Sequence, residues 1–158
     1  MLVPGKVQAG GGLRIMLATD GSEDAQRAAC VVAGLPGIRE VTIVSVVRTL
    51  GAEKAVLERF QPDESRKMEA AFLRQRRAGA RKAIAGCERL LRDASITVRP
   101  RVIAGHPAEA IVRAARRDAA DLLVVGSRGL TGVKAAALGS VSQAVAQLAP
   151  CPVLIVKP

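Results

Sequence analysis

The sequence predicts an α/β domain with a parallel sheet, on three observations. Short apolar runs rich in β-branched residues recur along the chain, helical patterns separate them, and no internal repeat is visible. Strands that alternate with helices are the pattern of βαβ units, in which the strands run parallel. A chain of 158 residues is long enough for one such domain with a substantial core. The five predicted strands are Leu13–Ala18, Val41–Val47, Ile96–Ala104, Leu122–Val125 and Val153–Val156.

The first strand leads into a clear helix start. Leu13–Ala18 is almost wholly apolar and predicts a central, buried strand. It ends at Thr19-Asp20-Gly21-Ser22, and Ser22 is followed by two acidic residues. A capping hydroxyl with acids in the first turn favours a helix N-terminus. We expect this helix to run to about Ala33, because Gly34 follows.

The middle of the chain holds the clearest strand and the longest helix. Val41–Val47 is β-branched except for Ser45. The connection Arg48–Phe60 carries no firm signal. A helix is expected from Pro62 to Arg92, because proline suits a first turn and apolar residues then recur on one face. The residues of that face are Leu73, Ala80, Ile84, Cys87 and Leu91.

A proline interrupts the third strand. Because proline cannot donate to a strand ladder, Pro100 predicts that this strand lies at an edge of the sheet. The next helix should begin at Pro107 and run to about Ala119. His106, the single histidine, precedes this helix and is expected to cap it.

A loop punctuated by glycines joins the fourth strand to the last helix. Leu122–Val125 stops at Gly126, and apolar residues at helix spacing resume after Gly139 and continue to about Ala149. The first N–H groups of a helix have no partner within it, and glycine lets an anion approach the backbone. The pattern predicts an anion-binding loop, to which Arg128 and Lys134 could add charge; the alternative is that the glycines only form turns.

The glycine spacing resembles the nucleotide-binding signature of the universal stress protein family. That signature is G-x2-G-x9-G-S/T, and Gly126, Gly129, Gly139 and Ser140 fill it without a gap. The resemblance extends to Ala18-Thr19-Asp20-Gly21-Ser22, to Gly105-His106-Pro107 and to the C-terminal residues 150–156, so it covers essentially the whole chain after Gly12. The chain has neither a Walker-type phosphate loop nor a GxGxxG dinucleotide fingerprint.

The resemblance implies a Rossmann-like fold, with a single open parallel five-stranded sheet in the order 3-2-1-4-5 and helices on both faces. In such a sheet ligands bind at the carboxyl ends of the strands where the winding reverses, here between strands one and four. The resemblance places adenine against the backbone of Val46, ribose near Asp20 and phosphates on residues 126–142. The nucleotide-binding residues that it implies are Ala18, Thr19, Asp20, Val46, Gly126, Ser127, Arg128, Gly129, Gly139, Ser140, Val141 and Ser142.

The function implied by the resemblance is ATP binding, with AMP or ADP as alternatives and Mg²⁺ arriving with the nucleotide at Asp20. It also implies a nucleotide-dependent switch in the stress response. We expect slow hydrolysis or none, because no residue is evidently placed to activate water. His106 with Ser127 or Ser140 matches no nucleophile elbow. A true ATPase and a basic module that binds polyanions stay open as alternatives.

The positive net charge suggests nucleic acid as a partner, whereas the low content of aromatic residues argues against it. The chain carries 24 Lys and Arg against 14 Asp and Glu, a net charge of +10. The only aromatic residues are two phenylalanines, so few side chains could stack on nucleic-acid bases. We therefore expect Arg74–Lys82 to be a solvated helix face and do not expect nucleic acid as a partner.

Cysteine usage predicts a reducing, cytoplasmic setting. Cys30, Cys87 and Cys151 are an odd, scattered set, which argues against a disulfide framework. Cys30 and Cys87 fall on apolar helix faces and are expected to be buried. No apolar run approaches the ~20 residues of a membrane span. We expect residues 1–12 to be a flexible leader before a domain of residues 13–158.

The C-terminal strand predicts self-association. Pro152–Val156 is short, apolar and expected at a sheet edge, and exposed apolar edges invite pairing. The family resemblance implies a homodimer through this strand.

Overall fold

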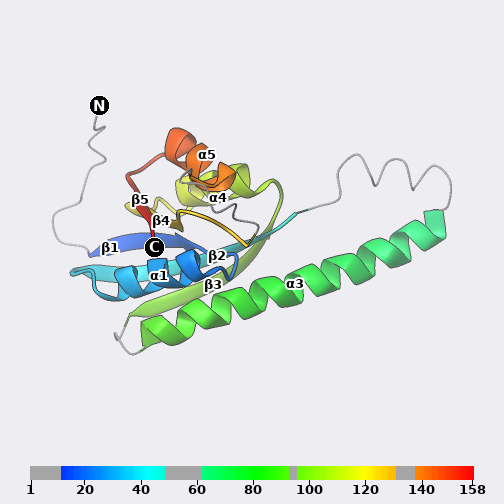
Figure 1. Ribbon diagram of the computed structural model, residues 1–158, viewed down its shortest axis with the longest axis horizontal. Helices are drawn as coiled ribbons and strands as arrows, with labels where there is room; N and C mark the ends of the chain where they lie inside the picture. The colour runs from blue at the N-terminus through cyan, green and yellow to red at the C-terminus, as the bar shows by residue number, and fades with distance from the viewer. Residues whose placement is uncertain (1–11, 49–61, 93–95, 131–137) are drawn as a thin grey trace.

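A computed structural model describes residues 12–48, 62–92, 96–130 and 138–158. Within these ranges five parallel strands form one sheet in the order β3-β2-β1-β4-β5, and four helices pack against it (Figure 1). The predicted α/β fold and its strand order 3-2-1-4-5 are confirmed. In chain order the elements are β1 (Leu13–Ala18), α1 (Glu23–Ala33), β2 (Ile38–Val47), α3 (Pro62–Arg92), β3 (Thr97–Ala104), α4 (Pro107–Arg117), β4 (Leu122–Gly126), α5 (Ser140–Leu148) and β5 (Val153–Val156).

The sheet is covered on both faces, and each face has its own core. Helices α1 and α3 pack on one face, where Leu17, Ile43 and Val124 are buried. Helices α4 and α5 pack on the other face, against Met16 and Val125 among others. Because successive side chains of a strand point to opposite faces, a strand buried on both sides is apolar throughout. This explains the continuous apolar runs in the sequence.

Strand β3 lies at one edge of the sheet, as its proline predicts, but it is not interrupted there. It runs unbroken through Pro100, which pairs in register with Ile43 of β2. The Gly105 N–H donates to Val47 O of β2 at 3.1 Å, so odd-numbered backbone groups of β3 face β2. The nitrogen of Pro100 therefore faces the open edge, where no donor is needed.

Element boundaries differ from the prediction by one to three residues at several helix and strand ends. Strand β2 begins at Ile38, three residues earlier than expected, and α4 ends at Arg117, two residues earlier. His106 occupies the N-cap position of α4, as expected, but its side chain makes no capping hydrogen bond. Its backbone oxygen accepts from Ala110 N at 2.8 Å instead. The cap expected at α1 is confirmed, since Ser22 Oγ accepts from Ala25 N at 3.3 Å.

The cysteines divide by the helix face on which they lie. Cys87 is fully buried between α3 and the sheet, as expected. Cys30 is exposed, contrary to expectation, because α1 buries positions 24, 25, 28, 29 and 32 and Cys30 falls outside that stripe. Among the described residues no helix is long and apolar enough to cross a membrane. The expected leader lies outside the described residues, except for Gly12.

Candidate functional site

The predicted site residues gather where β1 and β4 end side by side. Ala18 pairs in register with Val125, so Thr19 and Asp20 leave the sheet beside Gly126 and the residues that follow it. This is the position at which the winding of the sheet reverses, because β1 connects towards β2 on one side and β4 towards β5 on the other. The strand order thus brings together two segments that are about 105 residues apart in sequence.

The Asp20 side chain stabilises its own turn by a hydrogen bond and also contacts the glycine loop. Its Oδ1 accepts from Ser22 N at 2.9 Å, which makes it a turn residue. Its Oδ2 accepts from Leu130 N at 2.9 Å. The Ser22 hydroxyl donates to the Arg128 carbonyl at 3.2 Å, which adds a second link between the two segments. The exposed carboxylate of Asp20 therefore stands at the mouth of the loop.

Asp24 holds the glycine loop from below, a role that the sequence analysis missed. This buried carboxylate accepts from Ser127 Oγ at 2.8 Å and from Arg128 N at 3.1 Å through Oδ2. Its Oδ1 accepts from Arg27 at 3.3 Å, which balances the buried charge. In sequence Asp24 is indistinguishable from an ordinary acid in the first turn of a helix. Only the packing of α1 under β4 reveals its second role.

Close approach of the backbone requires glycine at position 126, and the contacts at Gly129 and Gly139 are tight. A Cβ at Gly126 would lie 2.7 Å from the carbonyl carbon of Asp24 and 2.8 Å from Ala25 N, so any side chain would push α1 off β4. A Cβ at Gly129 would lie 2.5 Å from Oδ2 of Asp20. At Gly139 it would lie 3.3 Å from the carbonyl oxygen of Ser127, a tight contact. The described ends of the loop, residues 126–130 and 138–139, therefore pack closely against α1, the turn at Asp20 and one another.

The N-terminus of α5 is fixed beside this loop and has no side-chain cap. Gly139 is the N-cap residue, and its N–H donates to Ser127 O at 2.8 Å. The buried Ser142 hydroxyl donates to Gly126 O at 2.7 Å, so it holds the helix against β4. The backbone N–H groups of the first turn, which includes the exposed Ser140 and the half-buried Val141, have no partner within the helix. Gly132 and Lys134 lie outside the described residues.

Val46 turns its backbone towards the space beyond β1. Val44 O accepts from Thr19 N at 2.9 Å on the β1 side, while Val47 O accepts from Gly105 N on the β3 side. By alternation the N–H and C=O of Val46 face the β1 side, where β1 has already ended at Ala18. The side chain of Val46 packs in the core between the sheet, α4 and α5. Core packing and an available backbone edge therefore coexist at this residue.

Thr19 connects the site to α3. Its Oγ1 accepts from Gly21 N at 3.2 Å and lies 3.4 Å from Cys87 Sγ, which donates to it. Burial raises the pKa of the Cys87 thiol, and the bond to Thr19 lowers it by less. Gly21 adopts a left-handed φ of 87°, and a Cβ there would lie 3.2 Å from Cβ of Ala83. The turn after β1 is thus packed tightly under α3.

The site offers a metal ion a single carboxylate. Among the described residues no group of three His, Cys, Asp or Glu side chains could hold a metal ion. Mg²⁺ is commonly bound through one or two carboxylates together with the phosphates of a nucleotide and water. The exposed Asp20 fits that partial role, since each of its oxygens accepts one N–H and keeps a lone pair.

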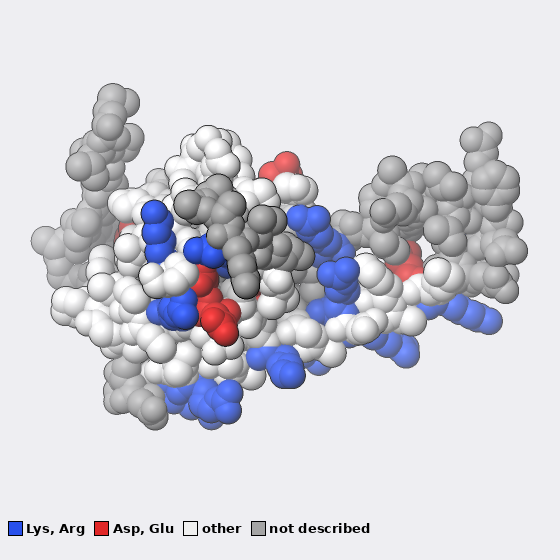
Figure 2. Space-filling view, viewed as in Figure 1, with Lys and Arg blue, Asp and Glu red and all other residues white. Residues whose placement is uncertain are grey.

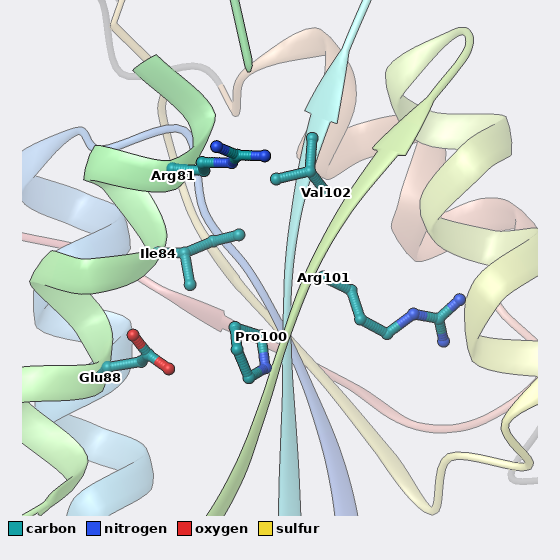
Figure 3. Close-up of a pocket in the computed structure, with 6 residues that line it drawn as sticks. All are labelled: Arg81, Ile84, Glu88, Pro100, Arg101 and Val102. Atoms are coloured by element: carbon teal, nitrogen blue, oxygen red, sulfur yellow. The ribbon is translucent and has the colours of Figure 1, made fainter. Parts of the chain in front are cut away.

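A surface cavity of about 370 Å³ lies elsewhere, between α3 and β3 (Figure 3). Arg81, Ile84 and Glu88 line it from α3, and Pro100 and Val102 line it from β3, whereas the side chain of Arg101 points to the opposite side of the strand. Arg101 is paired there with Asp118. No residue of the glycine loop lines this cavity, so it is separate from the candidate site.

Comparison with known proteins agrees with this fold. The model of the universal stress protein family matches residues 13–157. A universal stress protein of Thermus aquaticus is 35% identical over 148 residues, which cover 90% of this chain and 97% of the relative. The solved structure of MJ0577 from Methanocaldococcus jannaschii has a TM-score of 0.72 at 26% identity, over 92% of this chain and 95% of that one. A universal stress protein solved in complex with cAMP has a TM-score of 0.62 at 27% identity, over 92% and 97% of the two chains.

The family model spans nearly the whole chain, and the relative from Thermus aquaticus is covered over almost its full length. The resemblance seen in the glycine spacing is therefore confirmed, and this chain belongs to the universal stress protein family.

Proposed function

We propose that this protein binds an adenine nucleotide, ATP foremost, with the phosphates on the glycine loop and the N-terminus of α5. One contrast carries the proposal. The Ser22 side chain caps α1, whereas α5 begins at a glycine, and among the described residues no side chain caps its N-terminus. These donors lie at the positive end of the helix, where an anion is stabilised. The elaborate anchoring of that end by Ser127 and Ser142 supports a binding role over a simple turn.

The adenine and ribose of the nucleotide also have complementary groups on the protein. The outward backbone edge of Val46 suits the donor and acceptor edge of adenine, and the exposed carboxylate of Asp20 suits ribose hydroxyls or a magnesium ion on the phosphates. The relative solved with cAMP supports the adenine class of ligand. Ala18, Thr19, Arg128 and Gly129 complete the proposed pocket.

The biological role that we propose is a nucleotide-dependent switch in the stress response, with slow hydrolysis or none. The single histidine, His106, starts α4 after β3, and β2 and β1 separate β3 from the glycine loop. Asp24 is buried and already accepts three hydrogen bonds, so it is not free to activate water. The cytoplasm is the proposed setting, consistent with three cysteines that form no disulfide.

A homodimer through β5 is the assembly that we propose. β5 is the second edge of the sheet, and Val153 and Ile155 direct their backbone groups outward, because Pro152 O and Val156 O bond to β4. Parallel-sheet edges with free donors and acceptors pair readily with another strand.

The test is calorimetric titration of nucleotide-stripped protein with ATP, ADP and AMP, with and without Mg²⁺. We expect wild-type protein to bind ATP and Gly139→Asp to lose at least tenfold in affinity, because the carboxylate would cap α5 and repel the phosphates. The matched control is Gly79→Asp, which makes the same charge change on α3, where a Cβ meets nothing within 4 Å.

Thermal unfolding separates binding from folding in this experiment. Aspartate at an N-cap position stabilises a helix, so Gly139→Asp should unfold within a few degrees of the wild type. Absence of ATP binding by the wild type, or equal binding by both variants, would overturn the proposal. Rapid phosphate release that Asp20→Ala abolishes would instead favour the true ATPase.

A further inference from the structure

The two halves of helix α3 differ in how far their side chains are buried. From Arg66 to Gly79 no side chain is buried, whereas Ala80, Ala83, Ile84, Cys87 and Leu91 are all buried in the second half. Figure 1 shows the first half projecting beyond the sheet and the other helices. Residues 66–79, which we name the α3 arm, leave the body at the carboxyl ends of the strands, since Ala83 packs against the turn that follows β1.

The α3 arm is strongly basic. It carries five cationic residues and one acid, Glu69, and Arg81 and Lys82 follow directly. Lys67, Arg74 and Arg81 recur every seven residues, and Arg77 lies between the last two, so these four share one side of the helix. Basic side chains follow α3 in the space-filling view, and few acidic ones appear on that face (Figure 2).

An arm of this kind has little to stabilise it by itself. Isolated helices of this length are marginal in water, and most helical stability in proteins comes from a packed apolar face. Like charges three and four residues apart destabilise a helix further, as between Arg74 and Arg77 and between Arg77 and Arg81. From the sequence this stretch is expected to be the solvated face of a packed helix, but from 66 to 79 no side chain on any side of the helix is fully buried. A bound polyanion would remove the repulsion between the cations of the arm.

We propose that the α3 arm is a docking surface for the phosphodiester backbone of duplex nucleic acid. The row from Lys67 to Arg81 spans about 21 Å at 1.5 Å per residue, the axial length of roughly six base pairs at 3.4 Å each. Phosphate contacts of this type need cations in a row and no base recognition. The proposal adds a surface that is separate from the nucleotide site and does not depend on it.

Other occupants fit the arm less well. An anionic membrane needs a continuous apolar face, but the apolar side formed by Met68, Phe72 and Leu73 is broken by Glu69 and Arg76. A second copy of the arm would bring like charges together. Single-stranded nucleic acid calls for aromatic platforms. Phe72 is already covered by the Arg76 guanidinium, 4.9 Å from its ring centre.

The test is fluorescence anisotropy with labelled 20-base-pair DNA and RNA duplexes, at low and physiological salt. The arm variant is Lys67→Gln/Arg74→Gln/Arg77→Gln, and all three side chains are exposed. The matched control removes three exposed cations elsewhere, as Arg89→Gln/Arg92→Gln/Arg116→Gln, so both proteins have the same net charge. We expect the arm variant to lose at least tenfold in affinity and to flatten the salt slope by about 2 to 3, against less than threefold for the control.

Further readouts make each result decisive. Circular dichroism should show the arm variant folded and at least as helical as the wild type, because like-charge repulsion is relieved. Gly139→Asp should bind duplex as the wild type does, which keeps this proposal separable from the nucleotide site. Equal losses in both triple variants, unchanged binding by the arm variant, binding to anionic vesicles but not to duplex, or self-association that the arm variant abolishes would each overturn the proposal.

Discussion

The carboxylate of Asp24 forms hydrogen bonds with a loop that lies more than a hundred residues away in sequence. One oxygen of its carboxylate receives both the Ser127 hydroxyl and the Arg128 N–H, and these are the residues that shape the glycine loop. Because the carboxylate is buried, its removal would leave those donors without a partner in a dry environment. Loop geometry and α1 packing are therefore joined at one side chain.

Replacing Asp24 should weaken both the fold and ligand binding. We expect Asp24→Ala to lower the free energy of unfolding by about 2 kcal/mol, because buried donors lose their acceptor. Nucleotide affinity should fall as well, and Asp24→Asn should restore part of each loss, since an amide oxygen can still accept from Ser127. Urea unfolding and titration with ATP measure the two effects.

The control for Asp24 is the neighbouring acid. Glu23 is exposed and makes one long ion pair with Arg27, at 3.6 Å, so Glu23→Ala should change stability by a few tenths of a kcal/mol. If Asp24→Ala behaved like Glu23→Ala in both measurements, the positioning role of Asp24 would be wrong.

The cysteines should react in an order set by burial. Cys30 is exposed, Cys151 is half-buried and Cys87 is fully buried. Burial raises the pKa of both Cys151 and Cys87, and since the thiolate is the reactive form, both should react slowly. With a coloured disulfide reagent we expect one fast thiol, which Cys30→Ser removes, and reaction of Cys87 only on unfolding. A fast phase that persists in Cys30→Ser would contradict this order.

At the scale of elements, α3 consists of two halves with different energetics. Its second half contributes to the core below β2 and β3, while no side chain of the α3 arm is fully buried. Gly79 and Gly86 fall one in each half, and a Cβ at either position would meet nothing within 4 Å. They offer a matched pair for measuring how far each half is coupled to global unfolding.

Alanine at these two glycines should act differently. Gly86→Ala should raise the free energy of global unfolding by about 0.5–1 kcal/mol, because glycine is a poor helix former. Gly79→Ala should raise helix content in far-ultraviolet circular dichroism and leave the urea midpoint unchanged, since the arm can melt before the domain. Equal shifts of the midpoint would mean that the arm is part of the cooperative unit.

At the scale of the whole molecule, the two edges of the sheet differ. The open edge of β3 carries Pro100, whose nitrogen faces outward and cannot donate, so strand pairing there is blunted. The edge of β5 has no such interruption. Its side chains are nonetheless needed in the core, since Leu154 packs towards α1 and α3 while Ile155 packs towards α4 and α5.

The proposed dimer is best tested without a core substitution. A change such as Ile155→Lys would disturb packing as well as the edge. We expect sedimentation at micromolar concentration to give a dimer, and hydrogen exchange to show protection of the Ile155 amide that decreases on dilution. A monomer with a rapidly exchanging Ile155 amide would show that β5 is not the interface.

The elements and the glycine loop can be predicted from the sequence, because they follow from local spacing. Apolar runs defined the five strands, and Pro100 placed β3 at an edge. The spacing of Gly126, Gly129 and Gly139 pointed to the family that the comparisons establish. The strand order came from that resemblance and not from periodicity.

How distant segments meet becomes evident only in the folded chain. Ser127 and Asp24 are 103 residues apart, and their hydrogen bond exists because β4 lies beside β1 and over α1. The exposure of Cys30 depends on which stripe of α1 faces the sheet, and the exposure of most of the α3 arm depends on where the sheet ends. Local sequence specifies which face of an element is apolar, but the strand order and the length of the sheet decide which residues that face finally contacts.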